Sequence, residues 1–294
     1  MNEGFCYREE IGAAGAGRSV LAHLSDRYRH SAEDVWRDRI ARGEVLIGNR
    51  AAIASDVLRP GQSLVWRRPP WEEPAVPLAF AILYRDADLL AVAKPRGLPS
   101  IPNGGFLTHT LLHLVRQRFP EAAPLHRLGR GTSGITLFAR AKLARSAISA
   151  AWREGRVEKT YRALVTGVPE TEAFSVAARI GPVPHPRLGQ VYAAAAGGKE
   201  ALTHVRVLAA RGTVALVEVT IATGRPHQIR IHLAAAGHPL VGDPLYVKGG
   251  GTGPSPALPG ETGYRLHAYR LGLAHPVTGQ RLDLECGLPL ELRD

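Results

Sequence analysis

The sequence has little cysteine and no long apolar run. Its 294 residues contain two cysteines, Cys6 and Cys286, which lack the spacing of a metal site. Isolated cysteines are typical of proteins from a reducing compartment, so we expect a cytoplasmic location. No apolar run approaches the roughly 18 to 20 residues that span a bilayer, and the N-terminal stretch "MNEGFCYREEIG" carries three acids, unlike a secretory signal. We therefore expect a globular protein that has no membrane partner.

Lysine is also scarce, with five residues in the chain, although the formal net charge is +11 and the pI about 10.2. The excess charge is uneven along the chain. Residues 94–162 hold 13 lysines and arginines against three acids, whereas residues 1–70 hold 11 arginines against nine acids. A GC-rich genome replaces lysine by arginine, but it does not remove acids from one segment. Segment 94–162 therefore predicts a polyanionic partner, and nucleic acid is the expected one.

Residues 1–68 are predicted to form a small module. After about 15 weakly structured residues, apolar residues at helical spacing predict helices over 18–28 and 32–43. Short strands follow in "VLIGNR" and "SLVW". This order resembles the αL-type RNA-binding module of a ribosomal protein and of many RNA-modifying enzymes. The alternative is a structural cap on the main domain.

Residues 69–77 contain four prolines and are predicted to be a linker to a main domain over 78–294. The main domain is rich in short β-branched or aromatic runs, with fewer helical patterns, which predicts an α+β fold on a mainly antiparallel mixed sheet. The Gly/Pro-rich loop 248–263 is assigned no function. Helices are predicted over 108–119, 141–155 and 227–237.

The stretch "HRLGRGTSGITLFAR" (126–140) contains Gly129, Gly131 and Gly134 at the G-x-G-x-x-G spacing of a dinucleotide-binding loop. That loop requires a helix after the last glycine, so that the helix N-terminus meets the phosphates. Here "ITLFAR" favours a strand, and no acid ends a second strand about 20 residues later. The glycine spacing is therefore interpreted as a coincidence, and no nucleotide cofactor is expected.

A set of motifs in order indicates another class of protein. The chain resembles the RluA family of RNA pseudouridine synthases from about residue 78 to its end. The most specific of these motifs is "TGRPHQIRIHL" with "GDPLY" downstream. The motifs are "LLAVAKPRGLPSIP" (89–102), "PLHRLGRGTSGITLFAR" (124–140), "EKTYRALVTG" (158–167), "ATGRPHQIRIHLAAAGHPLVGDPLY" (222–246) and "LHAYRLGLAHP" (266–276).

The resemblance implies that the chain isomerises uridine to pseudouridine in structured RNA, either rRNA or tRNA, without a cofactor or metal. We also expect a monomer. The base is detached from the ribose, rotated, and rejoined through carbon instead of nitrogen. An aspartate in the family loop H-R-L-D starts the reaction, by attacking the nucleoside or by taking a ribose proton. The target uridine must first leave the base stack, since no side chain reaches it inside a helix.

Three positions carry over singly from the resemblance. Arg127 stands where the family inserts a basic side chain as the base leaves the stack. Tyr161 stands where an aromatic ring packs on the uracil, and Arg230 where an arginine pairs with the catalytic carboxylate. The plain alternatives are a surface charge, a strand core residue and a solvated helix face, respectively. Further candidates for RNA contact are Arg130, Lys159, Arg162, Arg225 and His227.

The departure from the family lies at position 129, where Gly129 replaces the catalytic aspartate, and Gly131 stands where an aspartate is frequent. Glycine neither attacks carbon nor accepts a proton, so the usual mechanism does not run through this position. Because glycine allows a wider range of backbone angles, we expect the loop to follow a different path.

Without an aspartate at position 129, a buried Arg230 is expected to lack its ion partner unless water, phosphate or another acid substitutes. The candidate acids are Glu158, Glu200 and Asp243, of which Asp243 belongs to a motif that orders a turn. Two functions remain open. One is a working pseudouridine synthase that uses a relocated acid or another route, and the other is a catalytically inactive RNA-binding protein that acts in RNA folding or ribosome assembly.

Overall fold

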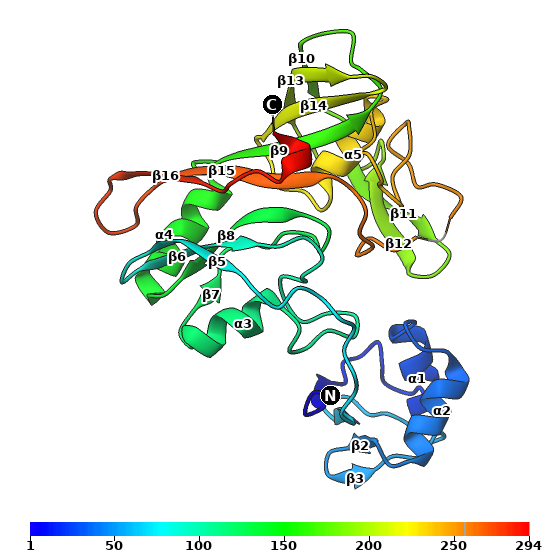
Figure 1. The fold of residues 1–294 in the computed structure, drawn as a ribbon. Coiled ribbons are helices and arrows are strands. Elements are labelled where there is room, and N and C mark those ends of the chain that lie inside the picture. The colour runs from blue at the N-terminus through cyan, green and yellow to red at the C-terminus, as the bar shows by residue number, and fades with distance from the viewer. Residues whose placement is uncertain (256, 294) are drawn as a thin grey trace. The chain divides into compact units, whose positions relative to one another are not determined.

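The computed structural model describes residues 1–255 and 257–293 and divides the chain into two compact units (Figure 1). The N-terminal unit contains Met1–Glu73 and Pro186–Gly189, and the main unit contains Pro74–His185 and the chain from Gln190 onward. The division falls inside the predicted linker 69–77, where the structure assigns neither helix nor strand. No helix in the described residues is long and apolar enough to cross a membrane.

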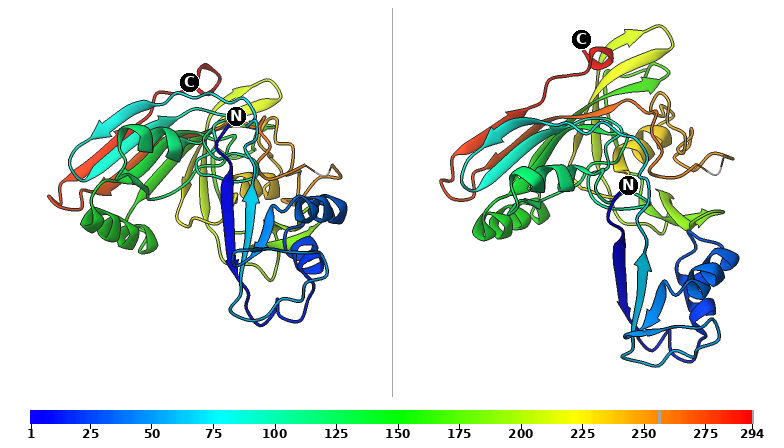
Figure 2. Two further views of the ribbon diagram at one scale, coloured as in Figure 1. Left: turned by 90° about the horizontal axis from the view of Figure 1, so that it is seen from below. Right: turned by 60° about the horizontal axis from the view of Figure 1, so that its bottom comes forward.

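In the N-terminal unit, both predicted helices are present and lie beside a four-stranded sheet in the order β1-β4-β2-β3. One expectation was wrong, because the first 15 residues are not weakly structured. They contain β1, which pairs antiparallel with β4 along its whole length, as Figure 2 shows. The partner strand lies over 50 residues later, so a local pattern does not reveal the pairing. The elements are β1 Phe5–Glu10, α1 Val20–Arg27, α2 Glu33–Ala41, β2 Val45–Ile47, β3 Arg50–Ala51 and β4 Ser63–Arg68.

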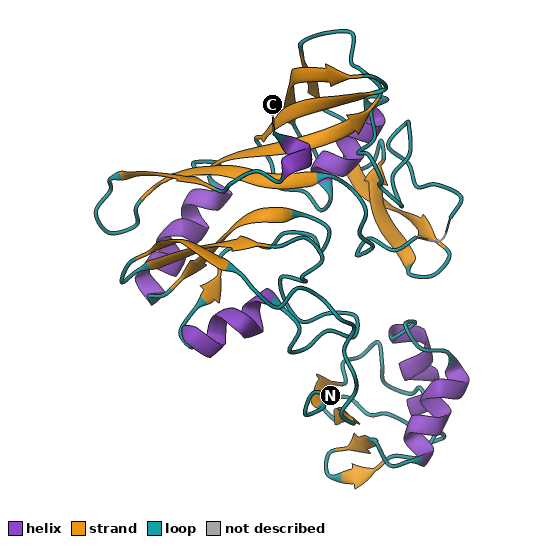
Figure 3. Ribbon diagram, in the orientation of Figure 1, coloured by secondary structure: helices purple, strands orange, loops and turns teal. Residues whose placement is uncertain are grey.

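The main unit is built on a 10-stranded sheet with few helices, which confirms the α+β prediction (Figure 3). Among the strand pairings described in this sheet, β8 with β15 is the parallel one, and the others are antiparallel. The strands are β5 Ala81–Arg85, β6 Leu89–Lys94, β7 Ala123–Pro124, β8 Ser133–Ala139, β9 Glu158–Thr166, β10 Ala173–Val176, β13 Thr203–Arg211, β14 Val214–Ile221, β15 Leu266–Ala274 and β16 Arg281–Glu285. A separate hairpin consists of β11 Ile180–His185 and β12 Gly189–Ala194.

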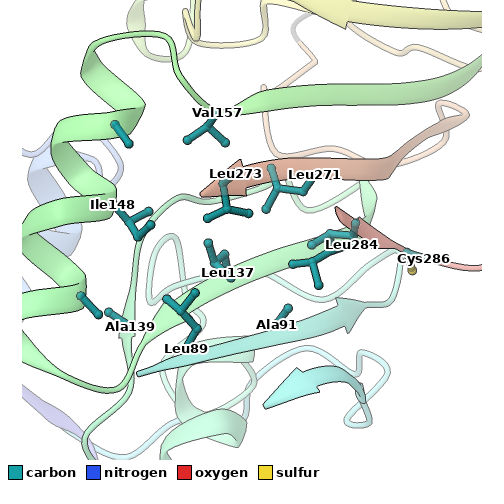
Figure 4. Close-up of a cluster of buried hydrophobic side chains, with 13 residues drawn as sticks. Leu89, Ala91, Leu137, Ala139, Ile148, Val157, Leu271, Leu273, Leu284 and Cys286 are labelled. Carbon is teal, nitrogen blue, oxygen red and sulfur yellow. The ribbon is translucent and has the colours of Figure 1, made fainter. Parts of the chain in front are cut away.

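Two helices cover opposite faces of strands β6 and β8, because successive residues of a strand point to opposite sides. Leu89 and Ala91 pack with α4 (Lys142–Arg153), whereas Leu90 and Val92 pack with α3 (Leu111–Arg118). Figure 4 shows the first of these clusters, in which Ile148 of α4 faces leucines from the sheet strands. Strands buried on both faces explain why these segments are apolar almost throughout.

Helix α5 (Gln228–Ala235) is buried on all sides from Gln228 to Ala234. Its residues Ile229 and Leu233 pack against the large sheet, and Ile231 and Ala234 pack with the β11–β12 hairpin. A charged side chain on this helix therefore has no solvated face and needs a partner inside the protein.

Residues Leu290–Leu292 form a short 3-10 helix, η1.

Gly134 is the glycine that allows β8 to approach β15. Its φ is +112°, and a Cβ at this position would lie 2.2 Å from the carbonyl oxygen of Ala268. We expect Gly134→Ala to reduce the free energy of unfolding by more than about 4 kcal/mol, as large backbone clashes in a core do. Gly155→Ala is the matched control, because Gly155 also has positive φ (+73°) but no atom within 4 Å of its Cβ position. The control should cost roughly 1 to 2 kcal/mol, and similar denaturation midpoints for the two variants would contradict this role of Gly134.

Candidate active site

The loop that precedes β8 is held in place at both ends. His126 accepts a hydrogen bond from the Leu137 amide at 3.0 Å, and its ring stacks on Trp152 with a centroid distance of 4.6 Å. The Leu128 carbonyl accepts a hydrogen bond from Ser100 Oγ at 2.8 Å, and the Leu128 amide donates one back to the same oxygen at 3.1 Å. The loop is therefore anchored on strand β8, helix α4 and the segment that follows β6.

Lys94 holds the centre of the loop through hydrogen bonds to backbone carbonyls. Its buried ammonium donates to the carbonyls of Leu98 at 2.7 Å, Pro95 at 2.9 Å and Arg130 at 3.3 Å. Burial, together with the positive charges of Arg130 and Arg96, lowers the pKa of Lys94 to about 7. The lysine in "AVAKP" thus ties two loops together, a role that sequence reasoning did not assign to it.

The backbone angles of this loop do not explain its glycines, and the expected change of path stays a prediction. Neither Gly129 nor Gly131 has a positive φ, so neither position requires glycine for its conformation. Both require it for space. A Cβ on Gly129 would lie 2.8 Å from Oη of Tyr264, and a Cβ on Gly131 would lie 2.7 Å from Cε1 of the same ring. The aromatic side chain of Tyr264 occupies the volume that two larger side chains would fill.

Tyr264 is buried, with 1% of its surface exposed, and its hydroxyl is within hydrogen-bond distance of Thr132 Oγ1 at 3.2 Å. The Arg230 guanidinium lies over its ring at 4.2 Å from the centroid, a cation–π contact. Sequence reasoning missed this residue, because it directly follows the loop 248–263 and stands in no recognised motif. Only its proximity to Gly129 and Gly131, more than 130 positions earlier, reveals it.

Arg230 has an ion partner, Asp243, which is one of the three candidate acids. Its Nε and Nη2 donate to the two carboxylate oxygens of Asp243, each at 2.7 Å, and its Nη1 donates to the Pro259 carbonyl at 3.0 Å. The side chains of Arg230 and Asp243 are 3% and 1% exposed. This bidentate, buried carboxylate neutralises the charge of Arg230, which the resemblance assigns to a catalytic aspartate at position 129.

Asp243 also orders a turn, as its motif suggested. Its Oδ1 accepts hydrogen bonds from the amides of Leu245 at 2.9 Å and Tyr246 at 3.1 Å. Both carboxylate oxygens are thus engaged. The other two candidate acids lie at the surface, where Glu158 pairs with Arg281 and Glu200 with Arg179, with side chains 67% and 82% exposed. Of the three acids, Asp243 alone is bonded to Arg230.

His227 shapes the start of helix α5. It is the one non-glycine residue with positive φ among the described residues, at 55°, a conformation that is uncommon for residues other than glycine. Tyr246 donates its hydroxyl proton to the Tyr192 carbonyl at 2.8 Å, so Nδ1 of His227 carries the proton that it shares with Tyr246 Oη at 2.7 Å. Burial and the charges of nearby groups, including Arg230 and Arg127, lower the pKa of His227 to about 4. His227 is therefore neutral at pH 7.

Tyr161 lies in β9, half-buried, and packs against the apolar cluster that contains Tyr264 and Ile229. Burial raises the pKa of Tyr161 to about 12, so its phenol is neutral at physiological pH. The alternative that Tyr161 is a core residue of a strand therefore describes part of its environment. Its predicted contact with the target uracil stays a prediction.

The basic candidates for RNA contact separate into two groups. Arg127 is exposed, and Arg130, Arg225 and His227 are partly exposed. Lys159 and Arg162, however, are each only 6% exposed, and the prediction that they face phosphates is corrected. Lys159 lies 5.7 Å from the centroid of Trp152, and Arg162 pairs with Glu218 at 3.4 Å. Both side chains lie on strand β9, which runs between β14 and β15 in the sheet and whose end residues Glu158 and Thr166 are exposed.

One group of side chains, Asp86, Asp88 and His275, has the composition of a metal site. Nδ1 of His275 accepts hydrogen bonds from two backbone amides, so Nε2 carries the proton and donates to Asp86 at 2.8 Å. Burial raises the pKa of Asp86, but hydrogen bonds from Tyr84, from two backbone amides and from His275 outweigh it and lower the pKa to about 2. The hydrogen bond between Asp86 and His275 therefore connects the end of β5 to the end of β15.

Comparisons with known proteins agree with the architecture of the main unit. The family model described as RNA pseudouridylate synthase matches residues 88–235. An uncharacterised RNA pseudouridine synthase of Synechocystis is 43% identical over 93% of this chain and 95% of its own length. Ribosomal large subunit pseudouridine synthase D of Neisseria meningitidis is 34% identical over 94% of this chain and 76% of its own. The solved structure of human RNA Pseudouridylate Synthase Domain Containing 1 has a TM-score of 0.57 and 28% identity, over 76% of this chain and 89% of the human chain.

This chain belongs to the RNA pseudouridine synthase family. Within that family it is of the RluA type, as its ordered motifs indicated.

The Arg230–Asp243 pair predicts a large asymmetry between the candidate acids. We expect Asp243→Asn to reduce the free energy of unfolding by about 3 to 5 kcal/mol, because it leaves the buried Arg230 charge without an anion. Glu158→Gln breaks an exposed ion pair with Arg281 and should leave the melting temperature near that of the unmodified protein. Thermal and chemical denaturation of both variants measure the difference, and equal stabilities would contradict the importance of the buried pair.

Proposed function

We propose that this chain isomerises uridine to pseudouridine within structured RNA, either rRNA or tRNA. The observation that carries the proposal is the cluster beside position 129, in which Arg230 is paired with Asp243 and enclosed by the rings of Tyr246 and Tyr264. Arg230 keeps a bonded anion although position 129 holds no carboxylate. Tyr264 also fills the space beside Gly129, which favours a site rebuilt for use over one in decay.

A second candidate function is RNA binding without turnover, in RNA folding or ribosome assembly. Gly129 favours it, because the position at which the family reaction starts has no carboxylate. Asp243 does not substitute for the missing group as it stands, since both of its oxygens are already bonded. The exposed Arg127 suits either function. Binding of RNA by the N-terminal unit, a monomeric state and a cytoplasmic location stay predictions.

Turnover separates the two functions. We expect the purified chain to release tritium from RNA that carries 5-tritiated uridine, because rejoining the base through C5 expels the hydrogen on that carbon. Chemical mapping of pseudouridine in cells with and without the protein would identify the RNA and the uridine. Tight binding of that RNA without tritium release, and without loss of a mapped pseudouridine, would favour the second function.

Phosphate contact by the exposed arginines predicts a salt dependence of binding. The logarithm of the association constant falls linearly with the logarithm of the salt concentration. Each phosphate that the protein neutralises contributes about −0.7 to −0.9 to the slope of this line. We expect Arg127→Gln to reduce the magnitude of the slope by about that amount, whereas Arg281→Gln, which removes an arginine paired with Glu158 and Asp283, should not. Fluorescence anisotropy titrations over a range of salt concentrations measure both slopes, and an unchanged slope for Arg127→Gln would rule out this contact.

A further inference from the structure

We propose that the phenol of Tyr264 takes the place of the missing aspartate as the catalytic acid–base group. The proposal rests on the proposed isomerase function and names the residue that performs it. The geometry points to Tyr264 because its Oη lies 2.8 Å from where the Cβ of residue 129 would be. A side chain at position 129 would therefore compete with this hydroxyl for space.

The hydroxyl of Tyr264 makes few hydrogen bonds within the described residues. Its hydrogen-bond contact is Thr132 Oγ1 at 3.2 Å, and Thr132 belongs to the same turn, since its amide donates to the Gly129 carbonyl at 3.0 Å. Gly129, whose Cβ position lies 2.8 Å from Oη, is exposed and carries no side chain. Because Tyr264 is 1% exposed and the loop is anchored at Leu128 and Arg130, a nucleoside flipped out of the RNA must displace Gly129 to reach Oη.

A neutral phenol is sufficient for a balanced reaction. Oη donates its proton to N1 of the uracil while the C1′–N1 bond breaks, and the bonding electron pair stays on the base. This leaves neutral uracil, a ribosyl oxocarbenium ion and a tyrosinate. The uracil rotates, C5 attacks C1′, and the tyrosinate removes the hydrogen from C5. The phenol is thereby restored, the product is pseudouridine, and no oxidant, reductant or other reactant is consumed.

The surroundings suit the charge that develops in this sequence. The tyrosinate formed in the first step lies against the Arg230 guanidinium, whose carbon is 4.2 Å from the ring centroid. The cation is fixed in place by Asp243 and the Pro259 carbonyl, so it needs no rearrangement as the charge appears. The arginine that the family pairs with a carboxylate would here stabilise a phenolate.

The first test removes only the hydroxyl. Tyr264→Phe should lower tritium release from 5-tritiated uridine in RNA by about 10²- to 10⁴-fold, the range of acid–base catalysis, with RNA affinity and melting temperature retained. Tyr269→Phe is the matched control, because Tyr269 is a buried tyrosine whose hydroxyl donates to Glu285 at 2.8 Å and which is not among the atoms nearest to the Cβ positions of Gly129 and Gly131. The control should release tritium at the rate of the unmodified protein.

The second test exploits the shared space. Gly129→Asp alone should lower the melting temperature, because its Cβ meets Oη at 2.8 Å. In the Tyr264→Phe background the next atom is Thr132 Oγ1 at 3.5 Å, an ordinary contact, so the double variant should regain both stability and tritium release. Gly131→Ala should gain nothing in that background, since its Cβ meets Cε1 and Cζ at 2.7 and 2.8 Å and phenylalanine keeps both atoms.

The outcomes distinguish this inference from the proposed function. Tritium release by the unmodified protein that persists in Tyr264→Phe would overturn the role of Tyr264 and leave the isomerase function standing. No release by the unmodified protein would contradict both. If the double variant then releases tritium, Tyr264 is a steric block in an inactive site. Loss of release in Tyr264→Phe with recovery in the double variant would support the proposal.

Discussion

The buried pair of Arg230 and Asp243 is the interaction on which the rest of the site depends. A guanidinium inside the protein is tolerated only when its charge and its donors are satisfied. Asp243 satisfies two of these donors and in addition orders the turn that leads to Tyr246. The third is satisfied by a carbonyl from the loop 248–263, which the sequence alone left without a role. One charged side chain thus determines the positions of a helix, a turn and a loop.

The structure requires glycine at positions 129, 131 and 134 for two different reasons. At Gly134 the backbone needs both a positive φ and the absence of a side chain, because β8 approaches the backbone of β15. At Gly129 and Gly131 the backbone is ordinary, and the constraint is the ring of Tyr264. The three glycines therefore have no common function, and their regular spacing has no bearing on nucleotide binding.

The charge of segment 94–162 is also used in two ways. Part of it is structural, since Lys94 ties two loops together through backbone carbonyls, and Lys159 and Arg162 are buried beside aromatic rings. Another part is exposed, as at Arg127. The excess of basic residues in the composition therefore exceeds the charge that faces an RNA backbone. A salt slope calculated from the sequence would be too steep.

The sequence by itself determined the family, the α+β class and the approximate limits of both N-terminal helices, α3, α4 and α5. Those features depend on local periodicity and on motifs such as "TGRPHQIRIHL", which are contiguous in the chain. Strand β1, the partner of Arg230 and the burial of Lys159 depend on segments far apart in sequence, so only the tertiary structure decided them. The same holds for Tyr264, which no motif marks. Its relation to Gly129 is a matter of volume, and volume is shared only after the chain has folded.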